Sequence, residues 1–236
     1  MKKLDVLILS AGSGKRLLST IPKTYIKLNG FPILYYSIKS FSFLDEINSI
    51  YVVIAKNMIN KFLHIKNKYL ADFAKLKGYI IGGDSRQQSV YNGLSFLKEL
   101  DKRAEYVAIH DGARPFIKPT LIKNIFDEAI LYGGASCGIK QVDTIKIIDD
   151  DIVKTHLKRD NLINIQTPQI FLFDKIISGY EYVIKNNIEI TDDSEAFSFI
   201  NGKTKIIKGD NDLIKITYKE DLKKAKEILN KDNMLI

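Results

Sequence analysis

Cysteine, histidine and long apolar runs are scarce in this sequence, and each scarcity excludes a class of protein. The single cysteine, Cys137, rules out an intrachain disulfide and fits a reducing compartment, so we expect a cytoplasmic protein. One cysteine and three scattered histidines also exclude a zinc site built from thiolates and imidazoles. The apolar run at 4–9 is too short to cross a bilayer and is followed at once by glycine and basic residues. We therefore interpret it as a first buried strand and expect no membrane partner.

The sequence also lacks a block of like charge. Its formal net charge is +8, but the lysines are spread along the whole chain without a run of five or six. The one local cluster, KEDLKKAKEILNK near the end, alternates with acids at helical spacing, which is typical of a solvated helix face. The excess positive charge therefore favours a small anionic substrate, and we expect no nucleic-acid partner.

What the sequence does contain is a regular alternation of short β-rich runs with segments of helical period. The expected strands are 4–9, 49–55, 78–81, 105–110, 134–140 and 204–209. Helical spacing follows Pro32, Asp84 and Pro119, and Thr217 with Glu220 forms a predicted capping box for a last helix. This pattern predicts one α/β domain over 1–236, with a Rossmann-like, mostly parallel sheet and helices on both faces. Ligands of such sheets lie at the carboxyl ends of the strands.

One segment, at about 140–162, breaks this alternation. It has β-branched runs on either side of the acidic turn Asp149-Asp150-Asp151, which predicts a β-ribbon that projects from the sheet as an arm. Its apolar residues have no obvious core of their own, and we therefore expect the arm to pair two subunits into a homodimer.

The loop after the first strand, SAGSGKR, matches neither of two familiar phosphate-binding patterns. Gly12 and Gly14 are too close for a Walker-type loop, and Arg16 stands where that loop needs serine or threonine. The dinucleotide fingerprint requires a third glycine where this chain has Leu17. Neither pattern assigns a nucleotide to this loop.

The composition of the loop nevertheless suits a phosphate chain. Four small residues, 11–14, allow backbone N–H groups to approach phosphates closely, and Arg16 and Lys23 add positive charge. Pro22 restricts the backbone just before Lys23, which suits a cation held at a fixed place. A tight turn with solvated basic residues is the alternative that this loop alone leaves open.

A second candidate site is IHDGARPFI, directly after an apolar strand. Asp111 is well placed to hold Mg²⁺ against a triphosphate, because Mg²⁺ uses few carboxylates together with phosphate oxygens. Arg114 would bind a second anion. The alternative is a turn in which Asp111 caps the backbone and Arg114 pairs with it.

Four shorter motifs carry further polar candidates, and each has a plain structural alternative. In GGDSRQQSV, Asp84 and Ser89 suit contacts to a base, although Asp84 would also serve as a helix cap. Thr167 in QTPQ and Thr191 in TDD are equally compatible with a turn and a cap. Lys215 interrupts the apolar run LIKIT, where a lysine that extends to solvent is the commoner explanation.

Taken together and in this order, these motifs resemble the nucleotidyltransferases that make CDP-linked alcohols. The resemblance is strongest to the 2-C-methyl-D-erythritol 4-phosphate cytidylyltransferase family of non-mevalonate isoprenoid synthesis. The matching stretches lie between 10 and 217: SAGSGKR with PK, GGDSRQQSV, HDGARPFI, VDTIK, QTPQIF, TDD and IKIT. The resemblance implies a Mg²⁺-dependent transfer of CMP from CTP to a sugar-alcohol phosphate, with release of pyrophosphate.

The resemblance also implies a role for each matching residue. The triphosphate would be held by Ala11, Gly12, Ser13 and Gly14, and the cytosine and ribose by Gly83, Asp84 and Ser89. Asp111 would hold Mg²⁺. The catalytic residues would be Arg16, Lys23, Lys215 and Arg159. The alcohol phosphate would be bound by Arg114, Thr144, Thr167 and Thr191, with Thr144 and Arg159 supplied by the partner's arm.

Two departures from the family pattern leave alternatives open. The arm reads THLKRD, with Lys158 in place of the usual acid, and the first loop begins Ser10-Ala11, where Pro-Ala or Ala-Ala is commoner. Because the arm would touch the alcohol, ribitol-5-phosphate cytidylyltransferase stays an alternative, although its first loop usually reads Ala-Gly-Gly. A non-catalytic nucleotide-binding module is the alternative of another class, and RNA binding through the basic surface is a third.

Overall fold

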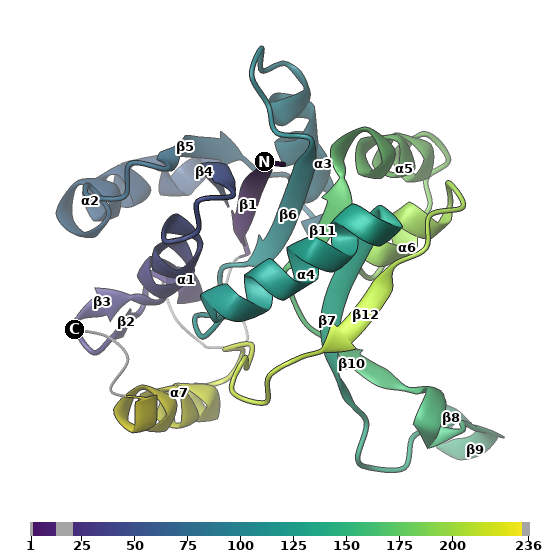
Figure 1. The fold of residues 1–236 in the computed structure, drawn as a ribbon. Coiled ribbons are helices and arrows are strands. Elements are labelled where there is room, and N and C mark those ends of the chain that lie inside the picture. Colours follow the sequence, from purple (N-terminus) through teal and green to yellow (C-terminus); the bar gives the residue numbers. More distant parts are fainter. Residues whose placement is uncertain (1, 13–20, 233–236) are drawn as a thin grey trace.

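The structure is a computed structural model that describes residues 2–12 and 21–232. Its centre is a sheet in which the described residues form eight strands, in the order β10-β7-β11-β6-β1-β4-β5 with β12 paired to β7 (Figure 1). The bounds of these strands are β1 (Leu4–Ser10), β4 (Ile47–Ile54), β5 (Leu76–Ile81), β6 (Tyr106–Asp111), β7 (Gly134–Lys140), β10 (Ile163–Ile165), β11 (Gln169–Leu172) and β12 (Lys205–Lys208).

Most of the sheet is parallel, as the alternation of strands and helices predicts. β1 pairs in parallel with β4 and with β6, and β4 pairs in parallel with β5. β12 is parallel to β7, whereas β10 and β11 run antiparallel to their neighbours. All six expected strands are confirmed, and β10 and β11 are additional to them. The parallel group puts the carboxyl ends of β1, β4, β5 and β6 at one edge.

Helices cover both faces of the sheet because successive strand residues point to opposite sides. Val6 and Ile8 pack into a cluster with α1, α2 and α4, whereas Leu7 between them packs with α3, α5 and α6. α7 packs with the short strands β2 and β3 in a smaller cluster. Within residues 2–12 and 21–232, no helix is both long and apolar enough to cross a membrane. The bounds are α1 (Ile33–Ser42), α2 (Ile59–Tyr69), α3 (Arg86–Lys98), α4 (Pro119–Tyr132), α5 (Phe173–Lys185), α6 (Asp193–Ser198), α7 (Lys219–Asp232), β2 (Lys27–Leu28), β3 (Phe31–Pro32), and the 3₁₀ turns η2 (Lys23–Tyr25), η3 (Lys56–Met58) and η4 (Arg159–Asn161).

β10 and β11 act as one strand with an interruption. Both lie along the edge of β7 opposite β12, because Ala135 and Gly138 each pair with β12 and with one of these two strands. From Ile165 to Ile170 the chain advances by five residues while β7 advances by three, so two residues are extra. The interruption contains Thr167 and the cis peptide that joins it to Pro168. It turns Thr167 toward the end of β6, where its hydroxyl reaches Asp111.

The predicted arm is present as an antiparallel ribbon of β8 (Lys146–Asp149) and β9 (Ile152–His156). Asp150 and Asp151 form its tip with φ values of 45° and 62°. Figure 1 shows the ribbon projecting from the end of the sheet where β10 lies. Its apolar side chains are exposed, with Ile152 at 73% and Ile148 at 58% of their full accessibility. The ribbon is confirmed, and its role in dimerisation stays a prediction.

The cap of α3 excludes the structural alternative considered for Asp84, and the predicted capping box of α7 is wrong in detail. The side chain that caps α3 is Ser85, whose hydroxyl accepts a hydrogen bond from the N–H of Gln88, so Asp84 does not serve as the cap. At α7 the acceptor is Asp221, which takes hydrogen bonds from the N–H groups of Thr217 and Tyr218 in place of the predicted box with Glu220. Each acceptor lies one residue further along the chain than the one considered from the sequence. Because Ser85 caps α3, the Asp84 carboxylate is not used as the cap and lies at the rim of a pocket.

Candidate active site

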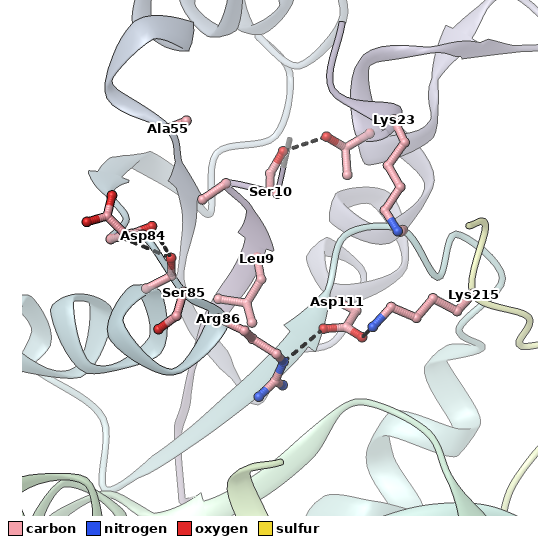
Figure 2. A pocket seen from close by; sticks show the side chains of 15 residues that line it. Leu9, Ser10, Lys23, Ala55, Asp84, Ser85, Arg86, Asp111 and Lys215 are labelled. Atoms are coloured by element: carbon pink, nitrogen blue, oxygen red, sulfur yellow. Dashed lines mark hydrogen bonds and ion pairs between the residues drawn. The ribbon is translucent and has the colours of Figure 1, made fainter. Parts of the chain in front are cut away.

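A pocket of about 540 Å³ lies where the carboxyl ends of β1, β4, β5 and β6 meet (Figure 2). This is the edge at which parallel sheets bind their ligands. Figure 2 shows Asp84 and Ser85 on one side, with Asp111, Lys23 and Lys215 on the other. The pocket therefore has a side of small and polar residues and a side that carries most of the charge. Its lining residues are Leu9, Ser10, Ala11, Gly12, Lys23, Thr24, Ala55, Gly83, Asp84, Ser85, Arg86, Ser89, Asp111, Ala113 and Lys215.

Two glycines let the loops around the pocket approach one another. A Cβ atom on Gly82 would lie 2.8 Å from the Cβ of Ala11 and 2.7 Å from Oγ of Ser89. A Cβ atom on Gly112 would lie 2.9 Å from the carbonyl oxygen of Leu9. All three distances are shorter than van der Waals contact, so any larger residue at either position would push the loops after β5 and β6 away from their neighbours. The loops lie close together because these positions carry no side chain.

The loop after β1 is described only in part. Ala11 and Gly12 line the pocket as predicted, whereas the predicted Ser13, Gly14 and Arg16 lie outside the described residues. Ser10, the unusual first residue of this loop, is buried, and its hydroxyl lies 2.6 Å from the hydroxyl of Thr24. Because Thr24 follows Lys23 in η2, this hydrogen bond joins the end of β1 to the turn that carries the pocket lysine.

The predicted base-binding residues come together at the other side of the pocket. Gly83, Asp84 and Ser89 all line it. The Gly83 N–H donates a hydrogen bond of 3.1 Å to the hydroxyl of Ser89, which is buried at the first turn of α3. The chain is thereby folded back over α3, so that small and polar groups form this wall. Their contact with a base stays a prediction.

Asp111, the predicted metal ligand, lies among three cationic side chains. Its Oδ2 is 2.7 Å from Nζ of Lys215 and 4.0 Å from Nε of Arg114, and its Oδ1 is 3.5 Å from Nε of Arg86. Burial would raise the pKa of this carboxyl, but the positive charges of Arg86, Lys215 and Arg114 outweigh burial and hold it well below its usual range. Asp111 is therefore ionised at any physiological pH, and the predicted Lys215 belongs to the site.

Arg86 is the charged pocket residue that sequence reasoning missed. Its guanidinium forms a bidentate pair with Asp193, at 2.9 and 2.7 Å, while its Nε faces Asp111. Asp193 is fully buried and also accepts a hydrogen bond of 2.6 Å from the hydroxyl of Tyr180. The available signal was the arginine that follows GGDS at a helix start. Its partner Asp193 is distant in sequence, so nothing local marked the pair.

Arg114 and Thr167 both lie beside Asp111. The Arg114 guanidinium donates to the carbonyl oxygens of Leu213, at 2.9 Å, and Ile165, at 3.4 Å. It thus joins the loop of Lys215 to the strand that ends before Thr167. The hydroxyl of Thr167 accepts a hydrogen bond of 3.0 Å from the N–H of Asp111. Neither side chain is among the pocket lining, so their predicted contact with an alcohol phosphate stays a prediction.

Three predicted residues lie away from the pocket in this chain. Both the N–H and the hydroxyl of Thr191 donate to the carboxylate of Glu195, at 2.8 and 2.9 Å, ahead of α6. Thr144 is exposed between β7 and β8, and Arg159 begins η4, where its guanidinium donates to the carbonyl of Val142. Thr144 and Arg159 thus belong to the base of the arm, and their action in another subunit's pocket stays a prediction.

The donor set at Asp111 suits a hard cation only together with a substrate. Over residues 2–12 and 21–232, no group of three or more histidine, cysteine or acidic side chains could hold a metal ion. One carboxylate is sufficient for Mg²⁺ when phosphate oxygens and water complete its six oxygen ligands, and Asp111 supplies one in the pocket. The residues present therefore fit Mg²⁺ that arrives with a triphosphate, with Asp111 as the protein ligand.

Comparison with known proteins agrees with this geometry. Residues 4–231 match the model of the family described as 2-C-methyl-D-erythritol 4-phosphate cytidylyltransferase. A protein of that name from Clostridium novyi is 39% identical over 97% of each chain. A crystal structure of 4-diphosphocytidyl-2C-methyl-D-erythritol synthase from Anaerococcus prevotii superposes with a TM-score of 0.83 at 33% identity, over 97% of this chain and 96% of that one. The cytidylyltransferase from Francisella tularensis gives 0.78 at 27% identity, over 96% and 99%.

Proposed function

Because this chain belongs to the 2-C-methyl-D-erythritol 4-phosphate cytidylyltransferase family, we propose that it transfers CMP from CTP to that alcohol phosphate. An oxygen of the alcohol phosphate attacks the α-phosphorus of CTP, and the bond from that phosphorus to the bridging oxygen breaks. The products are 4-diphosphocytidyl-2-C-methyl-D-erythritol and pyrophosphate, an exchange that belongs to non-mevalonate isoprenoid precursor synthesis. The observation that carries the proposal at the site is the ionised Asp111 beside Lys215 at the strand ends.

The reaction requires little from the protein beyond the positioning of the two substrates and the stabilisation of charge. A phosphate monoester is already nucleophilic, so the protein must bring two anions together and stabilise the departing pyrophosphate. Lys23 and Lys215 supply positive charge from two different loops of the pocket. We assign Arg16 to the same task, and Arg114, Thr167 and Thr191 to the alcohol phosphate. Cations held in place before the reaction do this without reorganising.

We propose that the small-residue side of the pocket holds CTP. Ala11 and Gly12, followed by Ser13 and Gly14, would offer backbone N–H groups to the triphosphate. Gly83, Asp84 and Ser89 would contact the cytosine and ribose. We also propose that 1–236 forms one domain and that the enzyme is cytoplasmic, a compartment in which a free cysteine such as Cys137 is expected.

We further propose that the reaction depends on Mg²⁺, with Asp111 as its protein ligand. The ion would neutralise charge on the triphosphate oxygens. Asp111 fits this role because Arg86, Lys215 and Arg114 keep it ionised. When CTP binds, Lys215 can exchange its contact with Asp111 for a phosphate oxygen, since its side chain is 39% exposed.

The arm supports the further proposal of a homodimer. Thr144 and Arg159 lie at the base of a ribbon whose isoleucines face solvent. In a dimer with exchanged arms, these two side chains would complete the alcohol-binding side of the partner's pocket.

A substrate panel tests the function. Pyrophosphate release is expected only when CTP, Mg²⁺ and 2-C-methyl-D-erythritol 4-phosphate are present together. Turnover with ribitol 5-phosphate instead would leave the reaction class standing and overturn the choice of alcohol. CTP binding without pyrophosphate release from any alcohol phosphate would leave only the nucleotide-binding module.

A further inference from the structure

His110 is a buried side chain next to the proposed metal ligand, and nothing in the mechanism above uses it. It is fully buried at the end of β6, with its ring packed edge-on against Phe41 at 5.3 Å between centroids. Both ring nitrogens have partners. Nε2 lies 3.1 Å from the carbonyl oxygen of Arg114, and Nδ1 lies 3.2 Å from the hydroxyl of Thr167. The ring therefore joins three segments of the site.

These contacts determine which atom donates in each hydrogen bond. A carbonyl oxygen only accepts, so Nε2 must carry the ring proton and donate to Arg114. The ring is fully buried, and its two hydrogen-bond partners, a carbonyl and a hydroxyl, are both uncharged, so the ring is neutral and carries only that one proton. Nδ1 then has a lone pair, and the hydroxyl of Thr167 donates to it.

The same hydroxyl also accepts a hydrogen bond from the backbone of Asp111. The distance from that nitrogen to Thr167 Oγ1 is 3.0 Å. A hydroxyl has one proton to donate. In this arrangement the proton goes to His110, and one acceptor position goes to Asp111. Thr167 is thus left without a proton for a substrate phosphate.

From this arrangement we infer that His110 and Thr167 form a positioning pair for Asp111, and that Thr167 does not donate to the alcohol phosphate. His110 orients the hydroxyl, the hydroxyl holds the N–H of Asp111, and the Arg114 carbonyl fixes the other side of the ring. The inference rests on the proposed function and changes the role assigned there to Thr167. It predicts that His110 and Thr167 act as a unit, although neither lines the pocket.

The main test is the kinetics of Thr167→Val, which keeps the shape of the side chain and removes the hydroxyl. A positioning role predicts that kcat falls about 100-fold, because small misplacements of reacting groups have effects of this size. The KM for the alcohol phosphate should change by less than about threefold, and Thr167→Ser should restore kcat. A higher KM at unchanged kcat would show a direct substrate contact and overturn the inference.

Two variants of His110 separate its two hydrogen bonds. Asparagine places an amide oxygen near the Nδ1 position and can still accept from Thr167, whereas glutamine reaches the Nε2 position and can still donate to the Arg114 carbonyl. His110→Asn should therefore retain more kcat than His110→Gln. Equal losses, or the reverse order, would contradict the pairing. Phe41→Leu is the matched control, because it loosens the packing of the ring and leaves both hydrogen bonds in place.

Non-additivity gives a further test. If the pair acts as a unit, His110→Gln combined with Thr167→Val should lower kcat no further than the worse single variant. Multiplied losses would overturn the inference.

A readout that does not depend on turnover separates this inference from the proposed function. Nitrogen-15 spectra of the imidazoles at neutral pH should show His110 as the neutral tautomer with its proton on Nε2. The signal is assigned by its loss in His110→Asn. Thr167→Val should shift Nδ1, since that nitrogen loses its donor. A proton on Nδ1 in the wild type would overturn the inference, whatever the substrate panel shows. Absence of turnover together with the expected spectrum would instead count against the proposed function alone.

Discussion

The surroundings of Asp111 and the projecting arm differ in the kind of side chain that they bury or expose. Around Asp111, the buried carboxylates of Asp111 and Asp193 are held by cationic side chains from other segments of the same chain. On the arm, apolar groups are exposed, and the partners of Ile148 and Ile152 within the described chain do not cover them. A buried charge without a partner is costly, so the first region must be complete in one subunit. Exposed apolar side chains carry no such requirement, so the partner of the arm can come from another copy of the chain.

The largest effect is expected at the pocket lysine. Lys23→Ala should lower kcat about 100- to 1000-fold, because a fixed cation that stabilises developing charge is lost. CTP affinity, measured by calorimetry, should change by far less. Lys123→Ala on the exposed side of α4 is the matched control and should keep full activity. An equal loss of CTP affinity and of turnover would show that Lys23 serves ground-state binding.

A mixing experiment tests whether the arm completes a second pocket. Lys23→Ala and Arg159→Ala proteins should each be nearly inactive. When they are mixed in equal amounts and allowed to exchange, about a quarter of wild-type activity should return, since half the dimers are mixed and each contains one intact site. No recovery from two folded, exchanging variants would place Arg159 outside the partner's site.

Disrupting the apolar surface of the arm should have a smaller effect on the fold than on assembly. Ile152→Asp puts a charge where the proposed dimer buries an isoleucine, and sedimentation should then show a monomer. Activity should fall about tenfold or more if the partner supplies Arg159. Thermal stability of the isolated subunit should stay within about 1 kcal/mol of wild type, since the side chain is 73% exposed. A dimer that persists would argue for a different interface.

Acid should weaken the Asp111 cluster. The pKa of Asp111 is lowered in the folded state by Arg86, Lys215 and Arg114, so its contribution to stability is present above the unfolded pKa and is lost as pH falls toward the folded one. Asp111→Asn should therefore lower the free energy of unfolding by about 3 kcal/mol at pH 7. Denaturation series should show this difference shrinking below about pH 4. A constant difference would mean that Asp111 titrates normally.

The smallest effect is expected from Ser10, the unusual first residue of the glycine loop. Ser10→Ala removes the hydrogen bond to Thr24 and should cost about 1 kcal/mol of stability. Because this bond ties the end of β1 to the turn of Lys23, kcat should fall by less than about tenfold. The preference for CTP over other nucleotides should be unchanged, and a change in that preference would place the Ser10 hydroxyl against the base.

The sequence predicts well what depends on neighbours in the chain. The buried strands and the helices after Pro32 and Pro119 follow from local runs of apolar residues, and all of them are present. α2 buries only Phe62 and Ile65, so its period was too weak to recognise. β10 and β11 were missed because Thr167 and its neighbours interrupt one strand with two extra residues.

The same division between features that depend on neighbours in the chain and features that depend on distant residues holds at the site. Asp111 ends β6, Lys23 follows β1 and Gly83 follows β5, and the rule about strand ends places all three at one pocket. The bond of Arg86 to Asp193 joins residues that are 107 positions apart, and only the folded chain reveals it. The role of Thr167 likewise depends on which atom accepts its single proton, which no motif encodes.

The strand β12 has a consequence for the behaviour of this protein at high concentration. It closes one edge of the sheet with the sequence Lys-Ile-Ile-Lys, and both Lys205 and Lys208 are exposed. A foreign strand that paired with this edge would have to bring its own backbone between two ammonium groups. Edge lysines of this kind oppose the growth of a sheet from molecule to molecule. The same two residues therefore protect the protein against aggregation during synthesis and storage.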